Sequence, residues 1–146
     1  MIGLLQRVSA ARVEIAGREV AAIGAGLLVL VGVQKDDAEV QAERLLERLL
    51  GYRVFADAEG RMNLSLRDTG GGLLLAPQFT LAADTKTGTR AGFSTAAEPA
   101  RARALFEHLV REARAAWPHT AAGEFGADMR VSLVNEGPVT FWLECR

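Results

Sequence analysis

The chain has 146 residues, a formal net charge of −1 and a hydrophobic fraction of 49%. This length suits one compact domain spanning residues 1–146, and the composition excludes a disordered chain. No apolar stretch approaches the roughly 18 residues that span a bilayer, and the near-neutral charge excludes a polycation that coats nucleic acids indiscriminately. The single cysteine, Cys145, excludes an intrachain disulfide. Because the first residues also lack the layout of a signal peptide, we expect a cytoplasmic protein.

The first third of the chain is typical of β-structure. Alternating and apolar runs predict strands at residues 13–15, 20–23 and 27–33. A helix is expected next, because apolar residues recur at helical spacing as far as Leu50. Asp36 or Asp37 is expected to cap its first turn.

The rest of the chain predicts further strands, a loop and a second helix. The predicted strands are residues 52–55, 63–66, 73–81, 129–134 and 139–144, with a turn at 135–138. Residues 82–93 are polar and aperiodic, which indicates a loop. The second helix begins between Thr95 and Pro99 and ends near Trp117. This order predicts an α+β fold: a mainly antiparallel sheet, barrel-like or in two layers, with two helices packed on it.

Familiar catalytic and metal-binding patterns are missing from the sequence. The chain has two histidines, one cysteine and no HExxH, CxxC, P-loop or GxSxG motif. A metal site therefore has little to build on in this sequence.

One segment that differs from plain scaffold is the run from Pro77 to Leu81. Proline cannot donate a ladder hydrogen bond, so Pro77 indicates an edge strand or the start of a strand. Along a strand, Gln78 and Thr80 would share one face and Phe79 would take the other. The alternative is an ordinary half-buried strand whose polar residues face water.

The second such segment is Asn135-Glu136-Gly137-Pro138-Val139-Thr140. The cis form of an X-Pro bond costs only about 0.5–1 kcal/mol, and glycine places no side chain before the proline. The Gly137–Pro138 step can therefore present two carbonyl groups on a tight, rigid corner. An ordinary hairpin turn fits the same spacing equally well.

Taken together, these two segments carry a resemblance to the D-aminoacyl-tRNA deacylase family along essentially the whole chain. The resemblance rests on residues 78–81 and 135–140, which have the family's order and separation. Further similar stretches are residues 1–8, 51–53, 62–64 and 141–143.

The resemblance implies a homodimeric editing enzyme without a metal or organic cofactor. Its substrates would be D-aminoacyl-tRNA and mischarged glycyl-tRNA, cleaved at the ester on the 3′-terminal adenosine. By resemblance, Gly137 and a cis Pro138 reach into the partner subunit's pocket and reject L-aminoacyl-tRNA, and Met129 contributes to substrate binding. The catalytic segment would be Gln78, Phe79 and Thr80, with Phe79 beside the terminal adenine. Lys86 and Arg90 would contact phosphates of the acceptor stem.

One departure from the family pattern is Pro77, which stands where the family usually has serine and so offers neither a hydroxyl nor a backbone donor. Thr80 is a weak candidate nucleophile, since neither motif contains a histidine or lysine to activate it. We expect instead that the 2′-hydroxyl of the substrate assists a water molecule. Two other interpretations stay open: a non-catalytic dimerising domain that binds RNA ends or a small ligand, and a general esterase with Thr80 as nucleophile.

Overall fold

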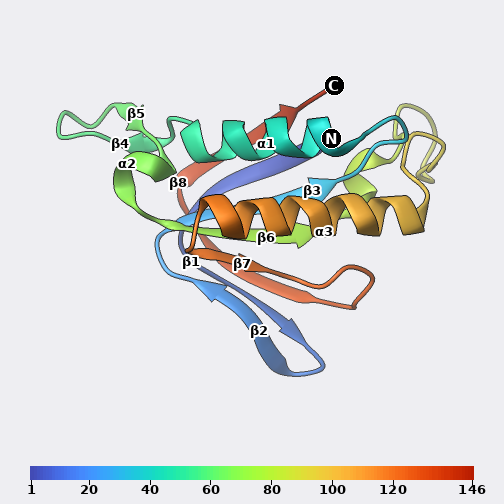
Figure 1. The fold of residues 1–146 in the computed structure, drawn as a ribbon, viewed down its shortest axis with the longest axis horizontal. Helices are drawn as coiled ribbons and strands as arrows, with labels where there is room; N and C mark the ends of the chain where they lie inside the picture. The colour runs from blue at the N-terminus through green and yellow to red at the C-terminus, as the bar shows by residue number, and fades with distance from the viewer.

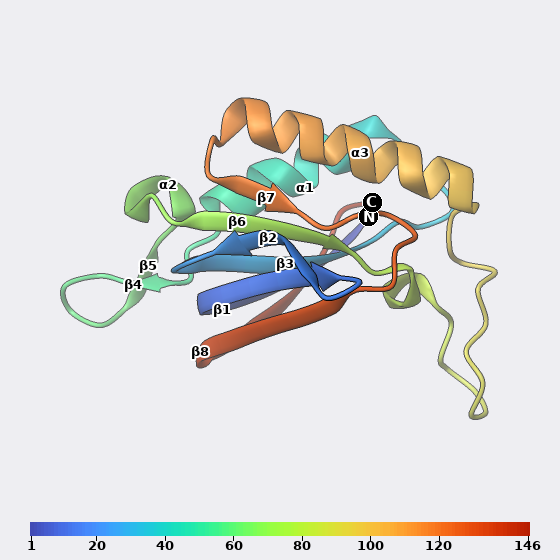
Figure 2. The same ribbon diagram turned by 90° about the horizontal axis from the view of Figure 1, so that it is seen from below.

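The computed structural model describes residues 1–146 and confirms the predicted α+β architecture. A six-stranded sheet curls toward a barrel, and two long helices cover one of its faces (Figures 1 and 2). The helices are α1 (Glu39–Gly51) and α3 (Pro99–Ala116). The strands of the sheet are β1 (Ile2–Ile15), β2 (Arg18–Ile23), β3 (Gly26–Gly32), β6 (Gly72–Pro77), β7 (Thr120–Ala122) and β8 (Arg130–Glu144).

Four smaller elements complete the chain. A separate two-stranded ribbon consists of β4 (Phe55–Ala56) and β5 (Met62–Leu64), and the short helix α2 (Leu66–Thr69) follows it. A single 3₁₀ turn, η1 (Phe79–Ala82), follows β6. None of the helices combines the length and hydropathy that a membrane-spanning helix needs.

The sheet is antiparallel around β1 and parallel beyond β3. Strand β1 pairs antiparallel with β2, β3 and β8, whereas the β3–β6 and β6–β7 pairs are parallel. Each parallel pair is joined by a crossover that contains a long helix, which places α1 and α3 on the same face. Strand β7 was not predicted, because its three residues, Thr-Ala-Ala, carry no apolar alternation.

Strand β1 exchanges one neighbour for another halfway along its length. Its first half pairs with β3 from Ile2 to Val8, and its second half pairs with β2 from Ala11 to Ile15. Along the opposite edge, β8 follows β1 through both halves, with register shifts between Gln6 and Ala10. The shifts lie where the neighbours are exchanged, and there the sheet curls.

Strand β8 contains a wide bulge where the sequence predicted a hairpin turn. Thr140 pairs with Gln6 and Asn135 pairs with Val8, so the four residues 136–139 lie opposite Arg7 alone. The predicted reversal of the chain is therefore wrong, because both halves of β8 pair with β1 in the same direction. The local sequence of a bulge and of a turn can be the same, and only the partner strand distinguishes them. The Gly137–Pro138 peptide bond is cis, as predicted.

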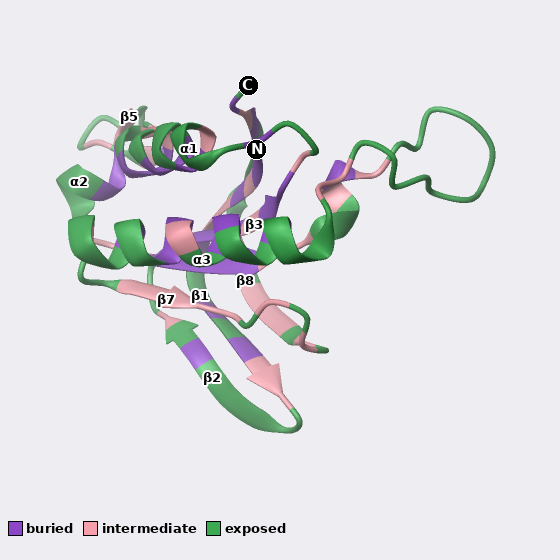
Figure 3. Cartoon of the chain, turned by 45° about the vertical axis from the view of Figure 1, so that its right-hand side comes forward, coloured by how far each residue is buried: buried purple, intermediate pink, exposed green.

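Both faces of the central strands are buried, against two separate cores. Leu27, Val29 and Val31 of β3 face the helices and pack with the apolar stripes of α1 and α3. Leu28 of β3 and Leu74 of β6 face the concave side, where they pack under the second half of β1. The buried stretches run along the middle of the sheet, and the outer faces of the helices are exposed (Figure 3).

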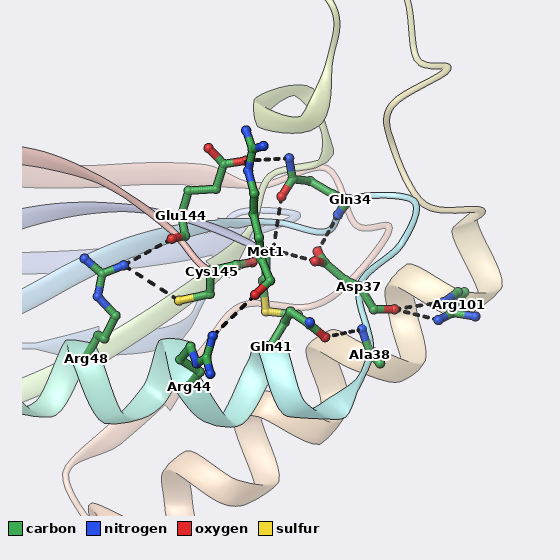
Figure 4. Close-up of polar contacts among 11 residues, drawn as sticks. Met1, Gln34, Asp37, Ala38, Gln41, Arg44, Arg48, Arg101, Glu144 and Cys145 are labelled. Atoms are coloured by element: carbon green, nitrogen blue, oxygen red, sulfur yellow. Dashed lines mark hydrogen bonds and ion pairs between the residues drawn. The ribbon is translucent and has the colours of Figure 1, made fainter.

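The first turn of α1 is anchored by a buried charge pair rather than by an aspartate cap. The N-cap is Ala38, and Asp37 is 4% exposed, so the predicted capping role of Asp36 or Asp37 is wrong. One carboxylate oxygen of Asp37 lies 2.5 Å from the ammonium group of Met1, and the other accepts a hydrogen bond from the backbone of Gln34 (Figure 4). Arg101 of α3 donates two hydrogen bonds to the Asp37 carbonyl. Through its carboxylate and its carbonyl, Asp37 thus connects Met1, the residue before β1, to the start of both long helices.

Replacing Asp37 by Asn is expected to lower the free energy of unfolding by about 3 kcal/mol, because the buried Met1 ammonium group loses its counter-charge. Chemical denaturation followed by tryptophan fluorescence measures the difference. The matched control is Asp36→Asn at the exposed neighbouring position, which should stay within about 0.5 kcal/mol of the parent chain. Equal effects of the two substitutions would contradict a stabilising role for the pair.

Candidate functional site

A cavity of about 630 Å³ lies where β6 ends, between η1, the start of α3 and the start of β8. Its lining is mainly apolar, and Glu98 is the only charged residue in it. Three residues that the sequence predicted to be functional line this cavity: Gln78, Phe79 and Met129. The first predicted segment and the residue before β8, far apart in sequence, therefore meet at one site.

The chain leaves the sheet at Pro77, so the predicted continuation of the strand to Leu81 is wrong. The backbone N–H of Gln78 still donates to Val31 of β3 at 2.7 Å, but that of Leu81 turns back to the Gln78 carbonyl. Strand β3 ends at Gly32, and no neighbour is left to pair with residues beyond Pro77. Residues 79–82 therefore form a 3₁₀ turn, although their polar and apolar residues alternate as in a strand.

The turn brings the side chains of Gln78 and Thr80 together. The Gln78 amide donates a hydrogen bond of 2.6 Å to the Thr80 hydroxyl. No other side chain bonds to this hydroxyl, and an amide is not a general base. The geometry offers Thr80 no group that would take its proton.

Phe79 lies open at the mouth of the cavity, with 59% of its surface exposed. Its ring pairs with that of Phe93, at a centroid distance of 5.2 Å and an interplanar angle of 39°. An exposed pair of aromatic rings beside an apolar cavity is suited to binding a flat, partly apolar ring such as a nucleobase.

Met129 and Phe125 also line the cavity. A side chain at Gly123 would approach the Met129 sulfur to 2.8 Å, so the absence of a side chain there allows Met129 its place. Phe93 and Phe125 were not predicted as site residues. Both lie in segments without periodicity, and single aromatic residues in such segments were the only available signal.

Lys86 and Arg90 lie on a loop that projects from the molecule next to η1 (Figure 3). Paired backbone hydrogen bonds between Asp84 and Gly92, of 2.8 and 2.9 Å, close the base of this loop. Both cationic side chains are exposed and neither forms an ion pair. The loop places two free positive charges near the cavity, and Phe93 connects it to the lining.

The Gly137–Pro138 bulge lies away from this cavity in the same chain. Val131 lines the cavity, and four residues of strand, about 13 Å, lead from it to Asn135, where the bulge begins. Neither Gly137 nor Pro138 contributes to the lining, and both are exposed. The structure therefore separates the two predicted segments within one subunit.

Side chains on both sides of the bulge hold it in place. Arg7 donates hydrogen bonds to the carbonyls of Glu136, at 3.0 Å, and Val54, at 2.8 Å. Within the bulge, the Asn135 amide oxygen accepts from the backbone of Val139, and its NH₂ group donates to the Thr140 hydroxyl. The corner is thus fixed and points to solvent.

Hydrogen bonding shifts the pKa of three carboxyl groups, and all three lie outside the cavity. Each pKa is lowered, chiefly by a donor beside the carboxylate: Asp57 by Asn63, Asp68 by the backbone of Ser65, and Glu144 by Gln34. No group of three or more His, Cys, Asp or Glu side chains is arranged to hold a metal ion.

Gly32 allows η1 to lie against β3. A Cβ atom at this position would lie 2.9 Å from the Leu81 Cβ and 3.3 Å from the Gln78 carbonyl oxygen. We expect Gly32→Ala to displace the turn and lower the free energy of unfolding by about 1–3 kcal/mol. Thermal denaturation measures this change. The control is Gly51→Ala, whose Cβ would meet only Arg67 at 3.5 Å, and it should be neutral or stabilising in the same experiment. A neutral Gly32→Ala would contradict this packing.

Comparisons with known proteins agree with this geometry. The family model described as D-Tyr-tRNA(Tyr) deacylase matches residues 4–144. A relative from Thioalkalivibrio sulfidiphilus named D-aminoacyl-tRNA deacylase is 66% identical over 144 residues, covering 99% of this chain and 97% of the relative.

Two solved structures share the fold. One is a c-Myc DNA unwinding element binding protein, with a TM-score of 0.95, 32% identity, and coverage of 100% of this chain and 99% of the other. The other is a probable eukaryotic D-amino acid tRNA deacylase, with a TM-score of 0.85, 17% identity and 97% coverage of both chains. Since one family model spans nearly the whole sequence and a relative is 66% identical across it, this chain belongs to the D-Tyr-tRNA(Tyr) deacylase family.

Proposed function

We propose that this protein is a D-aminoacyl-tRNA deacylase, which hydrolyses the ester between a D-amino acid and the terminal adenosine of tRNA. The observation that carries the proposal is the cavity at the end of β6, where Gln78, Phe79 and Met129 meet. The family and the name of the 66% identical relative support the reaction. Because aminoacyl-tRNA is consumed in translation, we place the reaction in the cytoplasm.

The terminal adenosine occupies the mouth of the cavity in this proposal. Its base stacks on the exposed ring of Phe79, an interaction worth about 1–3 kcal/mol per base. A cavity of about 630 Å³ lies in the range of small-molecule sites and accommodates the aminoacyl group beyond the ribose. Lys86 and Arg90 contact phosphates of the acceptor stem from the neighbouring loop.

Selection of the D enantiomer requires a second subunit in this scheme. Gly137 and Pro138 are exposed and separated from the cavity of their own chain, so we assign them to the cavity of the partner in a homodimer. Carbonyl groups of the bulge fix the α-amino group of the substrate there. A D side chain then points to open space and an L side chain strikes the wall. Glycine has no side chain and passes this filter, so mischarged glycyl-tRNA is also a substrate.

The free edge of β8 is the proposed dimer interface. This strand pairs only with β1, and its exposed apolar residues include Phe141 and Trp142, the latter 51% exposed. Exposed aromatic residues on an unpaired edge favour association of two copies about a twofold axis.

Hydrolysis is proposed to proceed without a covalent intermediate on Thr80. Its hydroxyl accepts a hydrogen bond from Gln78 and has no neighbouring base. The 2′-hydroxyl of the terminal ribose lies beside the ester and is already positioned to assist a water molecule. Backbone N–H groups of the turn would stabilise the oxyanion that develops on the ester carbonyl.

The reaction is tested with four substrates: a D-aminoacyl-tRNA, the matching L-aminoacyl-tRNA, glycyl-tRNA and a free aminoacyl ester. We expect rapid hydrolysis of the D-aminoacyl-tRNA and glycyl-tRNA and little of the L-aminoacyl-tRNA. Attack on none of the tRNA substrates would indicate a non-catalytic binding domain, and equal attack on the free ester would indicate a general esterase.

The mechanism predicts a contrast between two changes. Thr80→Ala should retain most of the activity, whereas a D-aminoacyl-tRNA ending in 2′-deoxyadenosine should react at least about 10²-fold more slowly. Single-turnover kinetics measures both rates. An acyl group trapped on Thr80, or an inactive but folded Thr80→Ala that still binds tRNA, would restore threonine as the nucleophile.

Assembly is tested by light scattering, where the protein should be a dimer at micromolar concentration. Trp142→Lys should shift it toward the monomer and abolish deacylation, because each cavity would lose the Gly137–Pro138 corner of its partner. Val20→Lys is the control, since Val20 is 44% exposed on a different strand. A fully active monomer would contradict the two-subunit site.

A further inference from the structure

A second cavity, of about 350 Å³, adjoins the first along helix α3. It lies between α3 and the segment that follows β7, and the two elements run side by side in both ribbon views (Figures 1 and 2). Phe125 lines both cavities, so the groove and the candidate site are neighbours on the two sides of this side chain. The charged lining of the groove consists of Arg103, Arg111, Arg114, Glu107 and Glu124.

Arg103 lies at the junction of the two cavities. Its guanidinium carbon is 5.1 Å from the centre of the Phe125 ring, a cation–π distance. A Cβ at Gly126, which has a φ of +81°, would lie 3.2 Å from the same guanidinium. The contact with Glu107 is long, at 3.8 Å, and the Arg103 side chain stays 51% exposed. Arg103 is therefore held in place while its charge remains available.

Arg111 and Arg114 extend the positive lining away from the site. The two lie three residues apart, so they are neighbours on the helix surface, where like charges repel. Both are exposed, and neither forms an ion pair with a carboxylate. Three arginines face two glutamates in the groove, and the two arginines farthest from the first cavity have no counter-ion.

We propose that this groove binds the single-stranded nucleotides that precede the terminal adenosine of tRNA, through their phosphate groups. The inference rests on the proposed function, since it places the terminal adenosine in the first cavity. From Arg103 to Arg114 the helix rises about 16 Å, so the arginines can contact successive phosphates of one strand. Guanidinium groups bind phosphate with two parallel hydrogen bonds, and the apolar floor contributed by Phe106 and Val110 suits the riboses. The groove thus serves a strand that continues from the stacked adenine.

The groove and the projecting loop have different roles in this assignment. Lys86 and Arg90 lie on the side of the cavity formed by Phe79 and Phe93, and the groove leaves from the side formed by Phe125. The loop therefore contacts the acceptor stem, while α3 contacts the 3′ strand.

The test compares two substrates of the whole protein: D-tyrosyl-tRNA, and D-tyrosyl-adenosine, which lacks the preceding phosphates. The double variant Arg111→Ala, Arg114→Ala should raise KM for the tRNA about tenfold with kcat unchanged. Its salt dependence should weaken by about 0.7 in the log–log slope for each lost single-strand phosphate contact. Hydrolysis of D-tyrosyl-adenosine should not change. Arg61→Ala, an exposed arginine on the β4–β5 turn, is the matched control and should affect neither substrate.

A binding measurement makes the test independent of catalysis. A fluorescent RNA ending in ACCA should bind the double variant about tenfold more weakly than the parent chain, and lysine at both positions should restore part of the affinity. Unchanged RNA binding and KM would overturn the proposal, as would an equal loss on both substrates. Loss of binding to poly-glutamate alone would instead indicate an acidic peptide and also overturn it. If the parent chain binds this RNA but hydrolyses neither ester, the deacylase function fails while the groove is retained.

Discussion

The exchange of neighbours along β1 is the constraint on which the rest of this fold depends. A strand has two edges, yet β1 pairs with three strands, because β3 occupies one edge as far as Val8 and β2 occupies it from Ala11. The sheet must curl at that point. The curl closes the second core over Leu28 and Leu74 and leaves β8 to follow a bent partner. At the bulge, residues 136–139 of β8 lie opposite the single residue Arg7 of β1, so β8 is longer than its partner at this point.

This geometry decides where the two recognisable segments lie. Residues 78–80 follow the end of β6, where β3 also ends and the chain must turn out of the sheet. The Gly137–Pro138 corner lies opposite Arg7 of β1 and is exposed to solvent. The cavity and the corner therefore lie apart within one chain. Two copies related by a twofold axis can satisfy both at once, which is the reason for placing the site across an interface.

Much of this arrangement was predictable from the sequence, and three predictions that were wrong share one physical cause. The stripes of Leu45 and Leu49 in α1 and of Leu105 and Leu109 in α3 predicted both helices, because those patterns depend only on local periodicity. The strand expected beyond Pro77, the turn expected at residues 135–138 and the aspartate cap expected for α1 were wrong. Each depends on a partner distant in sequence: β3 ends beside Pro77, β1 continues past the bulge, and the ammonium group of Met1 binds Asp37. The same holds for the site. Phe93 and Phe125 line the cavity together with residues that are distant in sequence, and local patterns do not show such contacts.

The chemistry of the cavity follows from what its lining contains. Glu98 is the only charged residue of its lining, and the proposed mechanism assigns no proton transfer to the protein. A site of this kind accelerates a reaction by positioning groups that the substrate brings with it. An aminoacyl-tRNA brings a vicinal hydroxyl beside the ester, a base that stacks and a chain of phosphates. The proposed site pairs these with the backbone of η1, the exposed ring of Phe79 and the arginines of α3. A free amino-acid ester without the adenosine offers none of these groups, so the proposal ties discrimination against it to the same placement that promotes hydrolysis.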